Sequence, residues 1–371
     1  MNSKYFIFGI IVFVIIVVIL GISLSGTEDT IKIGFVAPLT GDVAIWGNSA
    51  LAGVQLAVDE INETGGINGQ KVELFFQDGQ CSAEAAAKAY NSLVNGYELA
   101  GILGPVCSPE ASSGLPITAK DNMPDVIITA SAPDLTALGN NIFRVYPSDT
   151  LQGSFAAEYA YNNLGVRKVA IIYATNSWSQ GLNDKFTQTF ERLGGKVIYS
   201  DFVKTDQIDV KDIILNAEGS SPDLFYFPVY PQHVMQLLKE LESQENSNLI
   251  MLGDATATPE VIESGLGSGA YFVLPASILP KSFEKKIIDK SGITDLKINV
   301  AAPFGYDAAK VLLSAMENAN SLSHEDVIKE LKKTSMEGIS NPLIEFDEQG
   351  DLKNAAFQVM KIENKESILV E

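Results

Sequence analysis

The chain has 371 residues, which is enough for two domains that each bury a core of their own. Hydrophobic residues make up 46% of it and charged residues 19%, which excludes a disordered chain. The net charge of −20 at pH 7 argues against a nucleic-acid partner, because phosphate is bound by clustered Lys and Arg.

The first 30 residues form a separate segment. After Lys4, the run from Tyr5 to Thr27 carries no charge. This run exceeds the apolar core of a secretory signal, about 7–15 residues, and could cross about 30 Å of hydrocarbon as a helix. We expect an N-terminal hydrophobic helix, as either an uncleaved anchor over residues 5–24 or a removed signal peptide, and we favour the anchor. Both interpretations place the remaining chain outside the cytoplasm, where two cysteines can form a disulfide.

From residue 31 onward, short β-branched runs alternate with helical stretches, which predicts parallel sheets with helices on both faces. In the first helical stretch, Asn48 is the expected N-cap and Gly65–Gly66 the left-handed stop. Its apolar residues recur at spacings of 3, 4 and 3, which places Leu51, Val54, Val58 and Ile61 on one face. Residues 166–203 repeat the pattern of strand, helix, Gly-Gly stop and strand.

The alternation runs in two series, over about 31–148 and 149–277, and predicts two α/β lobes. The closing stretch "IEFDEQGDLKNAAFQVMKI" predicts a hairpin around Gln349–Gly350. Ligands of open α/β sheets bind beyond the carboxyl ends of the strands. The candidate binding residues are therefore those that follow predicted strands.

Several segments carry a family resemblance in combination: "PLTG", "WG", "GVQLAVDEIN", "GGINGQKVEL", "CSPEASSGLPITAKDNMPDVIITASAPDLT", "RVYPSDTLQG", "GYDAAKVLLSAMENA" and "FDEQGDL". Over residues 31–361 the chain resembles the type I periplasmic binding proteins, above all the branched-chain amino-acid-binding group of ABC transporter solute receptors. The resemblance implies two doubly wound α/β lobes with parallel sheets, joined by a three-crossing hinge that closes on a ligand. The first lobe would comprise 31–148 and 278–346, and the second 149–277 and 347–371.

The resemblance also implies a set of polar binding residues on the first lobe. Ser108 would grip the α-carboxylate of a ligand, and Pro109 behind it favours a helix start whose N–H groups attract anions. An ordinary N-cap serine is the alternative. Thr129 and Ser131 would hold the ligand ammonium and carboxylate, although Ser131 and Asp134 also have capping-box spacing.

Aromatic side chains would enclose the ligand. Trp46 and Trp178 are the only tryptophans, and both stand in polar loops after predicted strands. The resemblance places one on each lobe, over the ligand, whereas the alternative is packing at the surface. Tyr230 and Tyr306 also match aromatic positions of the family, and Tyr306 could equally belong to the core.

Two acids are candidates for the ligand ammonium. Asp254 ends a predicted strand of the second lobe, where a charge-assisted hydrogen bond to a buried ammonium would be strong. The family's ammonium-binding acid falls nearest Ala255, one residue away, and this shift leaves a small amide or carboxylate open as the ligand. Asp149 matches a position at the lobe crossing, and its alternative role is a helix cap.

The two cysteines, Cys81 and Cys107, follow adjacent predicted strands, so their loops can meet. In the family these positions are joined, which implies a disulfide that closes a loop of about 27 residues and contributes roughly 3.5 kcal/mol. Two free buried thiols are the alternative. Asn62 begins a glycosylation sequon whose use the sequence does not decide.

Catalysis is not expected. The only histidines are His233 and His324, and the sequence has no Gly-x-Ser-x-Gly elbow, no Walker loop and no Cys/His metal spacing. The stretch "GLGSGA" at 265–270 precedes a predicted strand and is interpreted as a turn. We expect neither a cofactor nor a bound metal.

Together these features predict an extracytoplasmic, membrane-anchored solute-binding protein of an ABC transporter. It would capture an amino acid, branched-chain or related, and pass it to permease subunits. The alternatives are a ligand-binding sensor or receptor, and a binding protein for a small amide or carboxylate.

Overall fold

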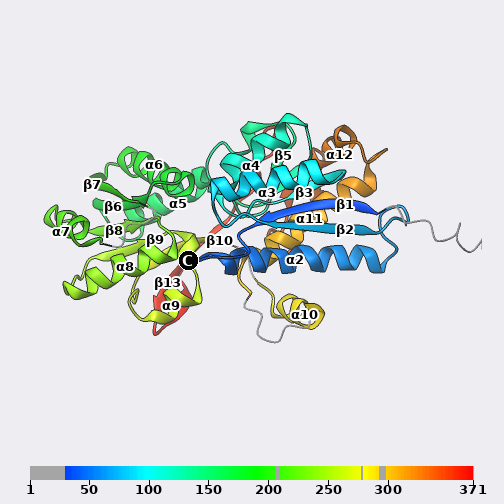
Figure 1. The fold of residues 1–371 in the computed structure, drawn as a ribbon. Helices are drawn as coiled ribbons and strands as arrows, with labels where there is room; N and C mark the ends of the chain where they lie inside the picture. Colours follow the sequence, from blue (N-terminus) through cyan, green and yellow to red (C-terminus); the bar gives the residue numbers. More distant parts are fainter. Residues whose placement is uncertain (1–29, 205–208, 277–278, 292–297, 371) are drawn as a thin grey trace, which may run out of the picture.

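The computed structural model describes residues 30–204, 209–276, 279–291 and 298–370. The predicted N-terminal hydrophobic helix lies outside these residues. The described chain folds into two α/β lobes that lie side by side, each around its own sheet (Figure 1). Within these described ranges, no helix combines the length and the apolar character needed to cross a membrane.

The first lobe is built on a five-stranded parallel sheet, as the alternating pattern predicts. Its order is β2-β1-β3-β4-β5. The strands are β1 (Ile31–Ala37), β2 (Val72–Asp78), β3 (Leu99–Leu103), β4 (Asp125–Ile127) and β5 (Ile142–Arg144). Strands β3, β4 and β5 are buried along their whole length, because helices cover both faces.

Helices α2 (Ala44–Glu63), α11 (Ala301–Asn318) and α12 (His324–Leu331) share a core with one face of this sheet. The other face is covered by α3 (Ala83–Gly96) and α4 (Ser108–Lys120). The lobe also contains η1 (Thr136–Leu138), α10 (Lys281–Ser291), β11 (Ser335–Met336) and β12 (Ile344–Glu345). A Cβ on Gly53 would lie 2.0 Å from the Ala302 carbonyl oxygen, so this glycine lets α2 and α11 pack closely.

The α2 helix begins earlier than predicted. It starts at Ala44 after Val43, and Asn48 lies inside it, where its amide donates to the Ala44 carbonyl at 2.9 Å. The N-cap prediction was wrong because the first turn begins directly after the loop that follows β1. The predicted stop is confirmed, since Gly65 and Gly66 have φ of +111° and +79°.

The predicted apolar face of α2 is present, although it is buried to different degrees. Val54 and Val58 are in the core, whereas Leu51 and Ile61 are partly buried at its edge. Near the end of the helix, the Asn62 side chain exchanges two hydrogen bonds of 2.8 Å with the backbone of Val72. The sequon amide therefore ties α2 to β2.

The second lobe is built on a seven-stranded sheet of order β14-β13-β10-β9-β8-β6-β7. Its strands are β6 (Lys168–Ala174), β7 (Lys196–Val203), β8 (Leu224–Phe227), β9 (Leu249–Leu252), β10 (Tyr271–Pro275), β13 (Phe357–Glu363) and β14 (Glu366–Leu369). The pairs from β7 to β10 are parallel, and β13 and β14 add antiparallel strands.

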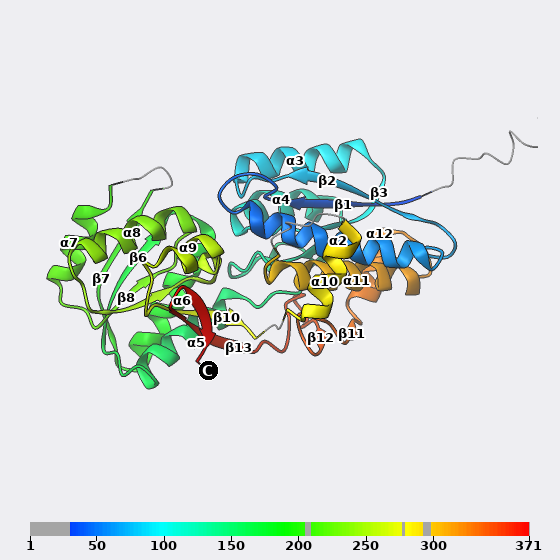
Figure 2. The same ribbon diagram turned by 90° about the horizontal axis from the view of Figure 1, so that it is seen from below.

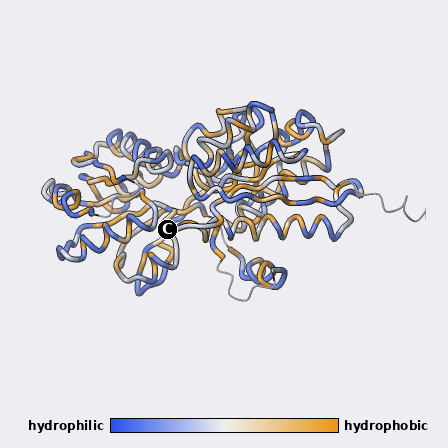
Figure 3. The backbone as a smooth tube through the Cα atoms, viewed as in Figure 1, coloured by the Kyte–Doolittle hydropathy of each residue, from blue (hydrophilic) through white to orange (hydrophobic). Residues whose placement is uncertain are grey.

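One face of this sheet packs on α5 (Asp149–Asn162) and α6 (Ser177–Arg192), and the other on α7 (Lys211–Gly219), α8 (Pro231–Ser243) and α9 (Pro259–Ser264). Hydrophobic residues concentrate along the strands of both lobes and on the sides of the helices that face them (Figure 3). Gly194 has φ of +97° between α6 and β7, as the repeated pattern predicts.

The chain passes between the lobes three times: between β5 and α5, between β10 and α10, and between β12 and β13 (Figures 1 and 2). Before the last passage, a tight turn around Gly350 closes a bridge between Phe346 and Leu352, where the sequence predicts a hairpin. Both residues belong to the core of the first lobe. The chain therefore stays with the first lobe several residues beyond the predicted boundary at 346. The hairpin of β13 and β14 was not predicted.

Candidate ligand-binding site

The carboxyl ends of both sheets face a cavity between the lobes. The cavity volume is about 30 Å³, so its walls lie close together. The walls come from loops and first helical turns that follow β1, β3, β4, β6, β8 and β9, as expected for an open α/β sheet. The lining residues are Val43, Trp46, Val106, Cys107, Ser108, Thr129, Ser131, Trp178, Tyr230, Asp254 and Ala255.

Seven of the nine predicted ligand-binding residues line this cavity. They are Trp46, Ser108, Thr129, Ser131, Trp178, Tyr230 and Asp254. These residues come from both lobes and from six different strand ends, and the fold brings them together. The other two, Asp149 and Tyr306, do not line it.

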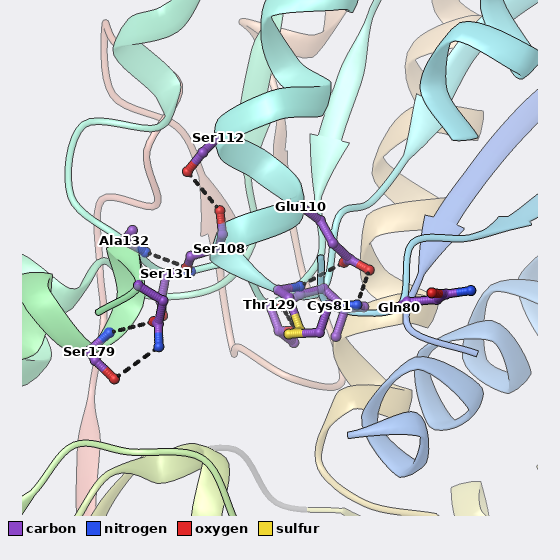
Figure 4. Close-up of a disulfide and its surroundings, with 12 residues drawn as sticks. Gln80, Cys81, Ser108, Glu110, Ser112, Thr129, Ser131, Ala132 and Ser179 are labelled. Carbon is purple, nitrogen blue, oxygen red and sulfur yellow. Dashed lines mark hydrogen bonds between the residues drawn. A yellow bond between two sulfur atoms is a disulfide. The ribbon is translucent and has the colours of Figure 1, made fainter. Parts of the chain in front are cut away.

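Ser108 is the first residue of α4, and Cys107 occupies the N-cap position, so Ser108 is not the cap itself. Its Oγ accepts hydrogen bonds from the backbone N–H of Ser131 at 3.2 Å and of Ala132 at 3.0 Å (Figure 4). Because both bonds are accepted by the oxygen, the hydroxyl proton is left to donate to a ligand. The N–H groups of the first turn of α4 add an anion-binding field.

Thr129 and Ser131 follow β4 on the neighbouring strand end. The Thr129 hydroxyl donates to the Val106 carbonyl at 2.9 Å, and the Ser131 carbonyl accepts from the Asp149 N–H at 2.8 Å. Both residues are buried. Asp134 has a left-handed φ of +61° and opens no α-helix, so the alternative of a capping box at Ser131 and Asp134 was wrong.

The two tryptophans are buried in the first turns of helices and not in loops. Trp46 lies in α2 and is 6% exposed, and Trp178 lies in α6 and is 3% exposed. Trp178 stacks on Tyr230, with ring centroids 4.8 Å apart and planes at 22°. Gly253 leaves room for Trp178, because a Cβ there would lie 2.9 Å from the indole. The surface-packing alternative is therefore wrong for both tryptophans.

Asp254 is the one ionisable acid on the cavity wall, in the part of the chain that the structure describes. It is 4% exposed, and its Oδ2 accepts a hydrogen bond of 2.7 Å from the hydroxyl of Tyr146. Burial raises the pKa of Asp254, and the bonds from Tyr146 and Gln152 act against this rise. Tyr146 was not among the predicted residues. Its position in the crossing stretch "RVYPSD", beside Asp149, was the only signal that could have indicated it.

Asp149 lies behind the cavity wall as the first residue of α5 and is fully buried. Its cap alternative was also wrong, because the N-cap is Ser148. Burial, and then the charge of Asp254, raise the pKa of Asp149 well above its usual range. The nearby Arg144 forms its ion pair with Asp351 at 2.6 Å.

Tyr306 lies away from the cavity, on α11. Its hydroxyl donates to Glu60 at 2.7 Å, and its ring meets Phe283 edge to face at 5.3 Å. Because α11 is amphipathic, this position faces α2 and α10 instead of the strand ends. We therefore remove Tyr306 from the proposed set of binding residues.

The predicted disulfide between Cys81 and Cys107 is present, with Cα atoms 5.3 Å apart. A second clamp runs beside it: the Glu110 carboxylate accepts from the backbone N–H of Cys81 at 3.1 Å and of Cys107 at 3.0 Å (Figure 4). Burial raises the pKa of Glu110 to about 7, against the effect of these bonds. Sequence reasoning missed Glu110, although its place three residues after the N-cap is a capping-box signal.

The two histidines contact backbone carbonyls. His233 Nε2 lies 3.0 Å from the Lys204 oxygen, and His324 Nε2 lies 3.0 Å from the Leu99 oxygen. The "GLGSGA" stretch leads from the left-handed Gly265 at the end of α9 into β10, so it is a turn. Among the residues that the structure describes, no group of three or more His, Cys, Asp or Glu is arranged to hold a metal.

The fold and the cavity together define a two-lobed α/β binding protein. The family described as periplasmic binding protein matches residues 30–367, and the chain belongs to this family. The chain is therefore an extracytoplasmic protein.

The relatives are amino-acid-binding proteins. The chain is 28% identical to a leucine-, isoleucine-, valine-, threonine- and alanine-binding protein of Pseudomonas aeruginosa, over 91% of both chains. It is 29% identical to a Leu/Ile/Val-binding protein of Rhizobium johnstonii, over 90% of this chain and 92% of that protein. The crystal structure of a leucine-binding protein from Thermotoga maritima superposes with a TM-score of 0.84, at 27% identity, and covers 92% of this chain and 98% of that one.

Proposed function

We propose that this protein is the solute-binding component of an ABC transporter and captures an aliphatic amino acid between its lobes. One observation carries the proposal: the Ser108 hydroxyl of the first lobe and the Asp254 carboxyl group of the second lobe line the same cavity. A zwitterion matches this arrangement, with its carboxylate at Ser108 and its ammonium at Asp254. The names of the related proteins support the same ligand class.

Each of the seven cavity residues has a proposed role. Ser108 binds the carboxylate, Thr129 and Ser131 form the wall beside it and orient the α-carbon, and Asp254 binds the ammonium. Trp46, Trp178 and Tyr230 enclose the side chain of the ligand and exclude water, which strengthens the polar interactions. Asp149 adds negative potential behind Asp254 without touching the ligand.

Closure is proposed as a rigid-body hinge motion at the three chain crossings. We place the last crossing after Leu352, because Leu352 packs in the core of the first lobe and Asp351 pairs with Arg144. The ligand would stabilise the closed state because only that state presents both walls to it. An ABC permease would recognise the closed pair of lobes, and residues 5–24 would hold the protein at the membrane as an uncleaved anchor.

A thermal-shift screen of the purified protein tests the ligand class. L-leucine, L-isoleucine and L-valine are compared with 4-methylpentanoate and leucinamide, each of which lacks one charged end of leucine. An amino acid at about 100 times its Kd should add about 2.7 kcal/mol of stability. A melt that shifts with the carboxylate or the amide and stays unchanged with every amino acid contradicts the proposal.

The transporter assignment has a test of its own. Co-purification from membranes should recover ABC permease subunits with the protein. Recovery of a kinase or a chemoreceptor without a permease would instead assign the protein to signalling.

A further inference from the structure

One buried hydrogen bond connects the lobes through the site. Tyr146 follows β5 in the first lobe, where its ring packs on Phe304 with centroids 4.7 Å apart, and it is 1% exposed. Its hydroxyl donates to Oδ2 of Asp254, which follows β9 in the second lobe, at 2.7 Å. Opening the lobes as rigid bodies would separate the two groups, so this bond belongs to the closed state.

The other oxygen of the same carboxyl group is left for a ligand. Asp254 lines the cavity, and no side chain or backbone group of the described residues forms a hydrogen bond of good geometry with its Oδ1. The Gln152 side chain and the backbone N–H groups of Asp254 and Ala255 lie close enough to lower the pKa of the carboxyl group, but none of them carries a charge. A buried carboxylate oxygen without a donor is costly, because it has lost its water. An ammonium group in the cavity would supply both the donor and the opposite charge.

The neighbouring groups do not supply that charge. The ionisable side chains around Asp254 are Asp149 from α5, Tyr226 from β8 and Tyr230 at the start of α8. Arg144, whose charge acts on Asp149, is engaged by Asp351 and by the Ala132 carbonyl at 2.8 Å. Asp254 forms no ion pair within the described part of the chain.

We propose that Tyr146 is a positioning residue for recognition of the ligand's amino group: its hydroxyl holds Oδ2 of Asp254 on closure and presents Oδ1 to the ammonium. This inference rests on the proposed amino-acid function and adds a residue that does not line the cavity. It makes Tyr146 a second determinant, acting through Asp254, that separates amino acids from carboxylates of the same shape.

A pH dependence follows from the same contact. Burial raises the pKa of Asp254, and the Tyr146 bond is the first of the interactions that lower it. Burial and the charge of Asp254 raise the pKa of Tyr146 well above its usual range, so its hydroxyl stays a donor. Ammonium binding requires ionised Asp254. Amino-acid affinity therefore falls as pH falls through the pKa of Asp254, and loss of the tyrosine hydroxyl moves that fall to higher pH.

The test is isothermal titration of the full chain and its Tyr146→Phe variant with L-leucine and with 4-methylpentanoate, between pH 5 and pH 9. The phenylalanine ring keeps the packing on Phe304 and removes only the hydroxyl. We expect L-leucine to bind the variant about 10- to 100-fold more weakly at pH 7, the range for a hydrogen bond to a charged group. The pH at which leucine affinity falls should rise, and 4-methylpentanoate affinity should change less than about twofold.

Tyr226→Phe is the matched control, because Tyr226 is 2% exposed, lies near the same acids and stacks on Phe186 at 4.5 Å. This variant should keep the leucine affinity and the pH profile of the unmodified protein. Equal leucine affinity and an unshifted pH profile in Tyr146→Phe overturn the role of Tyr146 while the proposed function stands. Failure of the unmodified protein to bind any amino acid overturns the proposed function and this inference with it.

Discussion

The two lobes present different chemistry to the same cavity. The first lobe contributes neutral polar groups, Ser108, Thr129 and Ser131, and the loop before Ser108 is fixed by a disulfide and by Glu110. The second lobe contributes an acid, Asp254, and the two stacked rings of Trp178 and Tyr230. The difference indicates a division of labour, in which one lobe recognises the anionic end of a ligand and the other its cationic end. Under the proposed function neither wall would be sufficient alone, and tight binding would require closure.

Removing the negative charge of Asp254, on the second-lobe wall of the cavity, should have the largest effect on binding. Asp254→Asn keeps the size of the side chain and cannot pair with an ammonium. We expect L-leucine affinity to fall by about 1000-fold, or about 4 kcal/mol, as for loss of one partner of a buried charge pair. Isothermal titration checks this value. A change of less than about fivefold would remove Asp254 from ammonium binding and break the comparison between the lobes.

Removing the disulfide of the first lobe should lower the free energy of unfolding by nearly as many kcal/mol as Asp254→Asn costs in binding. The Cys81→Ser, Cys107→Ser double variant opens a loop whose ends are 26 residues apart. The free energy of unfolding in urea should fall by about 3.5 kcal/mol in the chain-entropy account. A thiol titration of the unmodified protein, unfolded without a reducing agent, should detect no free thiol. Two free thiols would contradict the disulfide.

Glu110, whose carboxylate bonds to the backbone of both Cys81 and Cys107, should make the free energy of unfolding depend on pH. The pKa of Glu110 is about 7 in the folded protein, against an ordinary value of 4.5 for the unfolded chain, so the unfolded chain loses this proton first. Folding stability should therefore fall as pH rises from about 4.5 to about 7, by up to about 3 kcal/mol, and level off above. Urea unfolding of Glu110→Gln should lack this part of the pH dependence. Identical pH profiles in the variant and the unmodified protein would exclude a titrating Glu110.

The smallest expected effect is that of a single hydroxyl of the first lobe. Ser108→Ala removes one donor to the ligand carboxylate and should weaken L-leucine binding about 10- to 100-fold, the range for a hydrogen bond to a charged group. Ser113→Ala is the matched control on the same helix, because its hydroxyl donates to the Ala83 carbonyl at 2.7 Å and does not line the cavity. Equal affinity in both variants would assign Ser108 to holding the loop that contains Ser131 and Ala132.

Sequence was most informative where a residue type has one dominant physical use. Gly65, Gly66 and Gly194 have the left-handed φ that their positions at helix ends require. The rule that ligands lie beyond strand ends was sufficient to find seven of the cavity residues, because the fold brings those ends to one place.

Several of the misses depend on contacts between segments far apart in the sequence, whereas the missed hairpin has a local cause. From sequence alone, Tyr306 cannot be distinguished from an aromatic residue that binds a ligand. Only the packing of α11 on α2 decides that its hydroxyl meets Glu60. Tyr146 is identified only by its partner 108 residues away, and Glu110 by Cys81, which is 29 residues away. The β13–β14 hairpin was missed because its turn, Asn364–Lys365, has positive φ without a glycine.

The most direct test of the division between the lobes is isothermal titration of the unmodified protein with three matched ligands: L-leucine, 4-methylpentanoate and 3-methylbutylamine. The last two keep the branched side chain and retain only the anionic or only the cationic end. If each lobe recognises one end, leucine should bind at least about 100-fold more tightly than either analogue, since each lost end removes charge-assisted hydrogen bonds. An analogue that binds as tightly as leucine would contradict the account.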